Sequence, residues 1–115
     1  MAGIDRAKIV DVETRSPKGT IHRLPIWIVT VDGAPYVRSV RGERGRWYRE
    51  ILARREGALH VGGVRVPVRP VHVRSDETIR AVSAALRKKY GKSGSLDSML
   101  VAAVLPTTLR LEPAA

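Results

Sequence analysis

Hydrophobic and polar residues alternate along much of the chain, and this period of two residues is typical of half-buried β-strands. The predicted strands cover Lys8–Arg15, Ile21–Val31, Tyr36–Arg41, Ala58–Val61, Val64–Val73 and Thr107–Leu111. Asp32-Gly33 and Gly62-Gly63 lie between pairs of strands and predict tight hairpins, because both positions of such turns need a positive φ. Pro25 interrupts the second strand, which indicates an edge, a bulge or a bend there.

A helical period replaces the alternation in three segments. The predicted helices cover Arg46–Arg55, Asp76–Tyr90 and Leu96–Leu105. Gly57 and Pro106 follow the first and the third, where such residues end helices, and Ser75 or Asp76 can cap the second. The order of hairpins and helices predicts a mainly β fold, an antiparallel β-barrel with flanking helices, in a single domain over residues 1–115.

The amino-acid composition excludes several kinds of site. The chain has no cysteine, which excludes disulfides, thiolate metal sites and a cysteine nucleophile. Its N-terminal region lacks the pattern of a signal peptide, and its longest apolar stretches are far too short to span a membrane. We therefore expect a cytoplasmic protein.

The formal net charge is +10, and arginine supplies most of it. Arginine presents a planar fork that suits phosphate and carboxylate groups. The excess is compatible with a nucleic-acid partner, with an anionic cofactor, or with nothing more than the base composition of the source genome.

The densest group of candidate ligand-binding residues lies at the end of the third predicted strand. Alternation places Val37, Ser39 and Arg41 on one face of that strand and Tyr36, Arg38 and Val40 on the other. Ser39 and Arg41 then lie near the barrel rim, beside Gly42 and the start of a helix. A hydroxyl, a guanidinium and free backbone N–H groups at a helix N-terminus predict a site for a phosphate or another anion.

Two aromatic residues begin the helix that follows, Trp47 and Tyr48. They either cover an aromatic ligand or anchor the helix in the core. The three histidines, His22, His60 and His72, are isolated in the sequence and are more typical of structural or exposed residues than of a catalytic site. No metal-binding spacing is present, and no catalytic residue can be assigned.

These segments resemble the FMN-binding split-barrel superfamily, in its deazaflavin-dependent nitroreductase-like branch. Within that branch they are most similar to a bacterial family of uncharacterised proteins with the signature W-x-V…YVRS-x-x-G-x-x-G-x-WYR. The signature corresponds here to Leu24–Val29, Tyr36–Gly42 and Gly45–Arg49, and Thr107–Pro113 resembles the closing strand of the family. Related barrels often have Arg-Lys-Ser-Gly after the first strand, whereas this chain has Arg15-Ser16-Pro17-Lys18-Gly19.

The resemblance implies a split β-barrel homodimer that holds FMN or a deazaflavin coenzyme in a groove at the dimer interface. It also implies an oxidoreductase that acts on small organic molecules. By position in the signature, the residues along the ring system are Pro25, Ile26 and Trp27; those facing the phosphate are Arg38, Ser39, Arg41 and Gly42; and Trp47 and Tyr48 lie beside them.

Two other functions fit part of this pattern. A basic nucleic-acid-binding module would account for the charge, but the arginines are spread over all predicted elements, and neither a helix-turn-helix nor an aromatic RNA-binding platform is visible. A split barrel without a cofactor, acting as a small-molecule carrier, fits the sequence as well as the cofactor-binding protein does.

Overall fold

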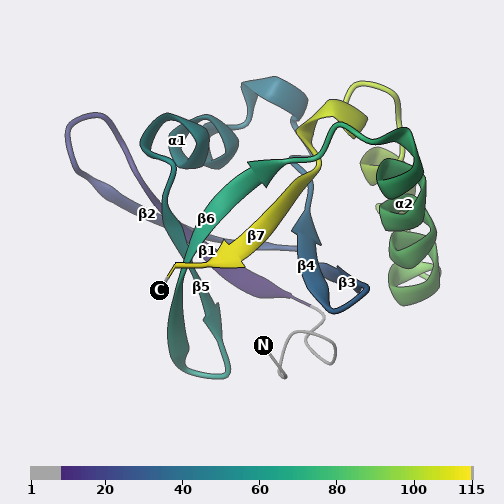
Figure 1. Ribbon diagram of the computed structural model, residues 1–115, viewed down its shortest axis with the longest axis horizontal. Coiled ribbons are helices and arrows are strands. Elements are labelled where there is room, and N and C mark those ends of the chain that lie inside the picture. Colours follow the sequence, from purple (N-terminus) through teal and green to yellow (C-terminus); the bar gives the residue numbers. More distant parts are fainter. Residues whose placement is uncertain (1–8, 115) are drawn as a thin grey trace.

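The strands of the chain form one antiparallel sheet that curls into an open barrel, as the computed structural model shows for residues 9–114 (Figure 1). The sheet has seven strands in the order β2-β1-β5-β6-β7-β4-β3. The strands are β1 (Val10–Arg15), β2 (Ile21–Ile26), β3 (Val29–Val31), β4 (Ala34–Val37), β5 (Gly57–Val61), β6 (Val64–His72) and β7 (Leu109–Pro113). This architecture confirms the mainly β, barrel-type fold predicted from the alternation.

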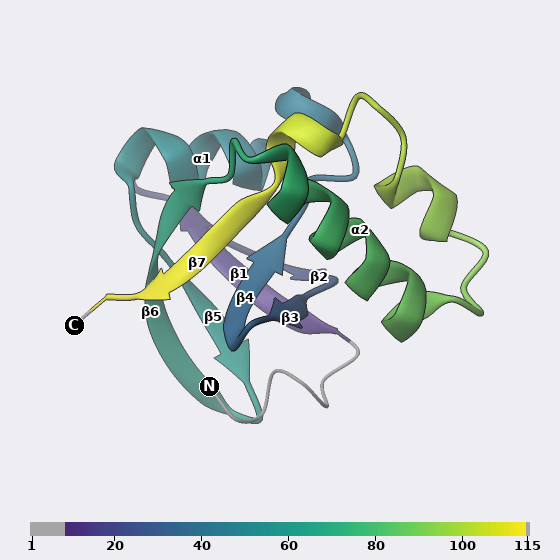
Figure 2. The same ribbon diagram turned by 45° about the vertical axis from the view of Figure 1, so that its right-hand side comes forward.

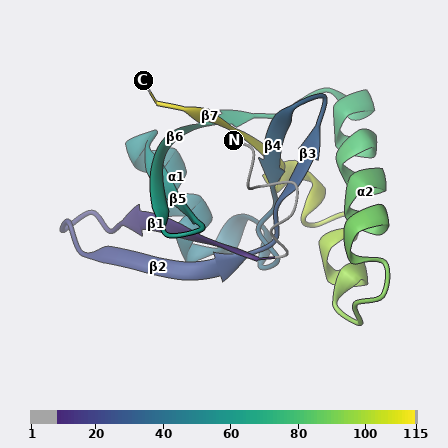
Figure 3. The same cartoon turned by 90° about the horizontal axis from the view of Figure 1, so that it is seen from below.

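The two edge strands, β2 and β3, are consecutive in the chain and are joined only by Trp27 and Ile28. The barrel is therefore split where the chain passes from one edge of the sheet to the other. Seen from below, the strands follow an open ring around the interior (Figure 3).

Over residues 9–114, two α-helices complete the fold: α1 (Arg46–Arg54) and α2 (Asp76–Tyr90). Helix α1 inserts Trp47, Tyr48 and Ile51 into the interior core, which also contains Val12 and Leu111 from the sheet. Helix α2 instead runs along the outside of β3 and β4 (Figure 2). The protein thus has two apolar layers, one inside the barrel and one between the sheet and α2.

On the outside of the barrel, α2 packs against a separate cluster that includes Val29, Tyr36 and Val82. Val37 belongs to the interior core, so the alternation predicted for Tyr36 and Val37 is confirmed. None of the helices described over residues 9–114 is long and apolar enough to cross a membrane.

Both predicted hairpin turns are present. Asp32 and Gly33 have φ values of 51° and 80°, and Gly62 and Gly63 have values of 56° and 80°. Two successive residues with positive φ give the turn whose twist matches that of the flanking strands, which explains the preference for glycine at these positions.

Several predicted boundaries are wrong at points where tertiary contacts replace the sheet. Pro25 does not interrupt its strand but lies within β2, opposite Asp11; β2 is an edge strand, so the edge predicted from this proline is confirmed. The break comes instead after Ile26. The strand predicted over Tyr36–Arg41 ends at Val37, and Lys8 of the first predicted strand lies outside the described residues.

The predicted ends of the helices also change. Arg55, with φ of 57°, ends α1 in the left-handed conformation. Gly57 begins β5 instead, where an added Cβ would lie 3.0 Å from the Glu13 carbonyl oxygen. The helix predicted over Leu96–Leu105 is replaced by two short 3₁₀ turns, Leu96–Met99 and Leu105–Thr107.

An ion cluster stabilises the outer face of the barrel. The Glu13 carboxylate accepts hydrogen bonds from Arg65 at 3.1 and 2.9 Å, and one of its oxygens lies 2.9 Å from His60 Nε2. The hydrogen bond from Arg65 has the largest effect on the pKa of Glu13. Together with the bond from His60 it outweighs burial, which raises this pKa, and lowers it to about 2. Because this pKa is below the ordinary value of 4.5, the cluster stabilises the fold above pH 4.5 and this contribution is lost as the pH falls toward 2.

We expect the variant Glu13→Gln to melt about 5 °C lower than the wild type at neutral pH, and to lose less stability on acidification. Thermal unfolding followed by circular dichroism between neutral pH and pH 2 measures both effects. Glu43→Gln, at an exposed carboxylate, is the matched control and should track the wild type. Parallel pH curves for the wild type and Glu13→Gln would contradict the assignment.

Candidate functional site

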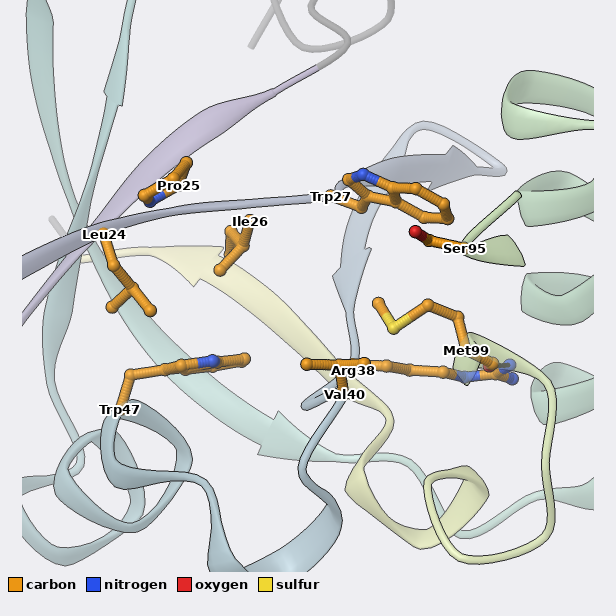
Figure 4. A pocket seen from close by; sticks show the side chains of 9 residues that line it. All are labelled: Leu24, Pro25, Ile26, Trp27, Arg38, Val40, Trp47, Ser95 and Met99. Carbon is orange, nitrogen blue, oxygen red and sulfur yellow. Dashed lines mark hydrogen bonds between the residues drawn. The ribbon is translucent and has the colours of Figure 1, made fainter. Parts of the chain in front are cut away.

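A pocket of about 300 Å³ opens beside the passage from β2 to β3. We call it the tryptophan pocket, because both tryptophans of the chain line it (Figure 4). Its lining residues are Leu24, Pro25, Ile26, Trp27, Arg38, Val40, Trp47, Ser95 and Met99. Most of these side chains are apolar, and they come from four separate segments of the chain.

The long walls of the tryptophan pocket come from β2 and α1. Leu24 and Ile26 point from the strand toward Trp47, whereas Pro25 points to the other side of the strand (Figure 4). Trp47 itself is buried in the interior core and presents its ring to the pocket. A flat, apolar space between a strand and an indole ring suits a planar aromatic ligand.

Trp27 forms one end of the tryptophan pocket. Its indole stacks on Tyr90 of α2, with ring centroids 4.1 Å apart and planes at 3°. The hydroxyl of Tyr90 accepts a hydrogen bond from the Ile28 N–H and donates one to the Ile28 carbonyl, both at 3.1 Å. These contacts fix the orientation of the Trp27 ring although the residue lies outside any strand.

Arg38 contributes its aliphatic stem to the tryptophan pocket, while its guanidinium points away toward Met99 (Figure 4). Its Nε donates to Thr108 Oγ1 at 2.8 Å, Nη1 to the Met99 carbonyl at 3.0 Å, and Nη2 to the Ile79 carbonyl at 2.8 Å. Burial, and secondarily the charge of Arg87, lowers the pKa of Arg38 to about 10. Arg38 thus remains a buried cation at neutral pH and joins three segments around the pocket.

A second pocket of about 250 Å³ adjoins the first and shares Leu24, Val40 and Trp47 with it. We call it the serine pocket; its other lining residues are Ser39, Arg41, Gly45 and Arg46. Whereas the tryptophan pocket is mostly apolar, the serine pocket combines a hydroxyl, two guanidinium groups and the start of a helix. The two pockets together form a groove that is aromatic at one end and cationic at the other.

Ser39 is the buried polar group of the serine pocket. It is 1% exposed, and within residues 9–114 its Oγ has no hydrogen-bond partner. A Cβ at Gly45 would overlap this oxygen, so glycine is needed there to leave room for the hydroxyl. Leaving a buried hydroxyl unpaired costs about 1–3 kcal/mol, and such groups often mark a functional site.

The start of α1 adds positive potential to the serine pocket. Its N-cap, Gly45, has no side chain to cap the first N–H groups, and the first turn contains no acidic residue. Arg46 and Arg49 lie instead at this end of the helix, where its dipole is positive and cations are unfavourable. An anion in the serine pocket would relieve both effects.

Most of the site residues predicted from the sequence line one of the two pockets, but two of them do not. Those that line the tryptophan pocket are Pro25, Ile26, Trp27, Arg38 and Trp47; Trp47, Ser39 and Arg41 line the serine pocket. Gly42 and Tyr48 line neither. Gly42, with φ of 65°, forms the turn that links Ser39 to Gly45, and Tyr48 anchors α1 in the core with its hydroxyl 3.0 Å from His72 Nε2.

Six lining residues were not among the predicted site residues: Leu24, Val40, Gly45, Arg46, Ser95 and Met99. The first four lie inside the signature and could have been found from their neighbours. Ser95 and Met99 reach the pocket only through tertiary packing, and no local pattern marks them.

The three histidines are isolated in the sequence, but each has a partner in the fold. His22 lies 3.1 Å from both oxygens of the buried Glu50, His60 contacts Glu13, and His72 lies 3.0 Å from the Tyr48 hydroxyl. These partners are 28, 47 and 24 residues away in the sequence, which is why no motif revealed them. Over residues 9–114, no three histidine, aspartate or glutamate side chains come close enough together to hold a metal ion.

The curled antiparallel sheet, with its two edge strands joined by Trp27 and Ile28, defines a split β-barrel. The chain belongs to the bacterial family described as "Uncharacterized protein conserved in bacteria (DUF2255)", whose model matches residues 1–111. No curated protein matches the sequence.

Solved structures share the fold at low identity. Campylobacter jejuni ChuZ is 12% identical with a TM-score of 0.75; the match covers 97% of this chain but only 50% of ChuZ. A putative pyridoxamine 5'-phosphate oxidase from Listeria innocua is 9% identical with a TM-score of 0.72; the match covers 99% of this chain and 90% of the oxidase. An F420-H2 dependent reductase (FDR-A) is 15% identical with a TM-score of 0.67; the match covers 91% of this chain and 94% of the reductase. The chain therefore spans about half the length of ChuZ, and these similarities concern the fold alone.

We expect Arg38→Met to reduce the free energy of unfolding by about 2 kcal/mol, because it leaves buried carbonyl groups without their donor. Urea unfolding measures the loss. Arg69→Met, at an exposed position of β6, is the control and should change stability by less than about 0.5 kcal/mol. Equal stability of the two variants would show that Arg38 does not hold the segments together.

Proposed function

We propose that this protein binds a flavin-type cofactor, FMN or a deazaflavin coenzyme, in the groove formed by the tryptophan and serine pockets. In this proposal it acts as a cytoplasmic homodimeric oxidoreductase on small organic molecules. The unpaired hydroxyl of Ser39, next to an uncapped and acid-free helix start, carries the proposal.

The residues present fit such a group at both ends. The flat ring system would lie between β2 and Trp47, with Trp27 and Met99 at the far end. The phosphate would receive hydrogen bonds from Ser39 and from the first N–H groups of α1, and positive charge from Arg41 and Arg46. When bound, the cofactor supplies hydride chemistry, while the protein orients it and excludes water.

The uncovered side of the groove supports the homodimer. Val40 lines both pockets and is 55% exposed, so the groove lacks a wall along this side. A second copy of the chain would supply that wall and shield the ring from solvent. The small-molecule substrate would enter between the two copies.

We expect Gly45→Ala to weaken cofactor binding at least tenfold, since the added methyl group occupies the space of the Ser39 hydroxyl. Isothermal calorimetry with FMN and with deazaflavin coenzyme measures the change. Gly94→Ala is the matched control, because a Cβ at Gly94 meets nothing within 4 Å. Failure of the wild type to bind either compound at tens of micromolar would reject the proposed function.

Ser39→Ala separates a binding role from a structural one, because the two properties should change in opposite directions. Removing an unpaired buried hydroxyl should raise the stability of the free protein by about 1 kcal/mol, while the affinity for the cofactor should fall. Chemical unfolding and calorimetry of the same preparation measure both. A loss of stability in this variant would indicate that the hydroxyl already has a structural partner.

A further inference from the structure

A third concavity, of about 590 Å³, lies at the C-terminal end of α2. We call it the lysine pocket; it is lined by residues 88–93, which include three lysines, together with Ile9 and Trp27. Trp27 lies at the end of the tryptophan pocket nearest α2 and also lines the lysine pocket (Figure 4). The serine pocket shares no residue with it, so the lysine pocket adjoins the proposed cofactor groove without being part of it.

The lysine pocket has a strong excess of positive charge. Lys88, Lys89 and Lys92 line it, and no carboxylate is among its lining residues. Cations are stabilised near the C-terminus of a helix, which accounts for Lys88 and Lys89 in the last turn of α2. Lys92 lies beyond the helix, so the positive charge of the pocket continues past the helix end.

Two of these ammonium groups are available to a ligand. Lys89 is already engaged, because its Nζ donates to the Ile28 carbonyl at 2.7 Å. Lys88 and Lys92 are exposed, and within residues 9–114 neither forms a hydrogen bond or an ion pair. Two unpaired cations that line one concavity repel each other, and an anion between them would offset this cost.

The turn after α2 brings the two lysines to the same pocket. A Cβ at Gly91 would lie 2.6 Å from the Arg87 carbonyl oxygen, so glycine is needed where the chain folds back over the helix end. The Ser93 N–H then donates to the Tyr90 carbonyl at 2.9 Å. Ser93 Oγ accepts from the Ser95 N–H at 3.2 Å, and within residues 9–114 its own hydrogen has no acceptor. This hydroxyl can therefore donate to a ligand.

One wall of the lysine pocket is apolar and held in place. Trp27 and Tyr90 form it through their parallel stack, and the Tyr90 hydroxyl is fixed by the backbone of Ile28. Ile9 adds an aliphatic side chain that is 57% exposed. An apolar wall beside ammonium groups suits a ligand that has a flat apolar body and a negative charge at one end.

We propose that the lysine pocket binds a small aromatic anion, a planar ring that carries one carboxylate or phosphate group. The ring lies against Trp27 and Ile9, and the anionic group pairs with Lys88 and Lys92. A neutral ring would leave the lysines unpaired, and a bare anion would leave the apolar wall uncovered, so the pocket selects for both features together. The inference does not require a cofactor in the groove and is therefore independent of the proposed function.

The test uses four compounds that separate the ring from the charge. They are 4-nitrobenzoate, 4-nitrophenyl phosphate, the neutral 4-nitrobenzyl alcohol and inorganic phosphate. Calorimetry with the whole chain should show saturable binding of at least one aromatic anion, and binding about tenfold weaker or less for the alcohol and for inorganic phosphate. The aromatic anion that binds more tightly identifies the head group. Equal affinity for the alcohol or for inorganic phosphate would overturn the inference.

A double variant tests the two lysines. Lys88→Gln combined with Lys92→Gln should weaken binding of the aromatic anion by about tenfold or more, because both partners of the charged group are lost. Arg69→Gln combined with Arg80→Gln removes two exposed charges from β6 and α2, and this matched control should bind within about twofold of the wild type. An unchanged affinity in the lysine variant would overturn the inference.

Amide spectra of the wild type locate the bound ligand. Addition of the aromatic anion should shift the amide signals of Gly91 and Ser93 and leave those of Ser39 and Gly45 in place. Shifts at Ser39 and Gly45 alone would put the ligand in the cofactor groove and overturn the inference. Absence of saturable binding of both aromatic anions at millimolar concentration would overturn it too, and the proposed function would still stand or fall by its own titration.

Discussion

The passage of the chain between the two sheet edges depends on the hydrogen bonds that the end of α2, Tyr90 and Lys89, makes to the backbone of Ile28. At this point the backbone leaves the strand ladder, and an unpaired buried N–H or carbonyl would cost about 1–3 kcal/mol. The Tyr90 hydroxyl supplies a partner to both groups, and Lys89 Nζ also donates to the Ile28 carbonyl at 2.7 Å. The side chain of Ile28 can then enter the interior core while the neighbouring Trp27 turns outward to stack on Tyr90.

The opposite side of the tryptophan pocket is organised in a similar way. Arg38 lies one residue beyond the end of β4 and binds the carbonyls of Met99 and Ile79. Helix α2 therefore supports both sides: Tyr90 at its C-terminal end holds the strand crossing, and Ile79 near its start accepts from the arginine. The pocket depends on polar contacts to α2 because the strand ladders do not extend that far.

The parts of this fold that could be predicted from the sequence are those governed by neighbouring residues. Hairpin turns need glycine for its backbone freedom, and the first turn of α1 follows from its apolar spacing, so Asp32-Gly33 and Trp47 were placed correctly. Ser39 was predicted to bind a ligand, but the close approach of its hydroxyl to Gly45 depends on three-dimensional packing. Ser95 and Met99 approach the groove from a segment without a period of its own, so neither could be identified.

The location of the two tryptophans has a practical consequence. Trp27 and Trp47 are the only tryptophans of the chain, and both line the same pocket. Intrinsic indole emission therefore comes entirely from the junction of β2, β3 and α1 and carries no signal from the β5–β6 hairpin. If that junction opens before the rest of the barrel, fluorescence and far-ultraviolet dichroism will record different transitions, and the difference between them will measure how independently the pocket unfolds.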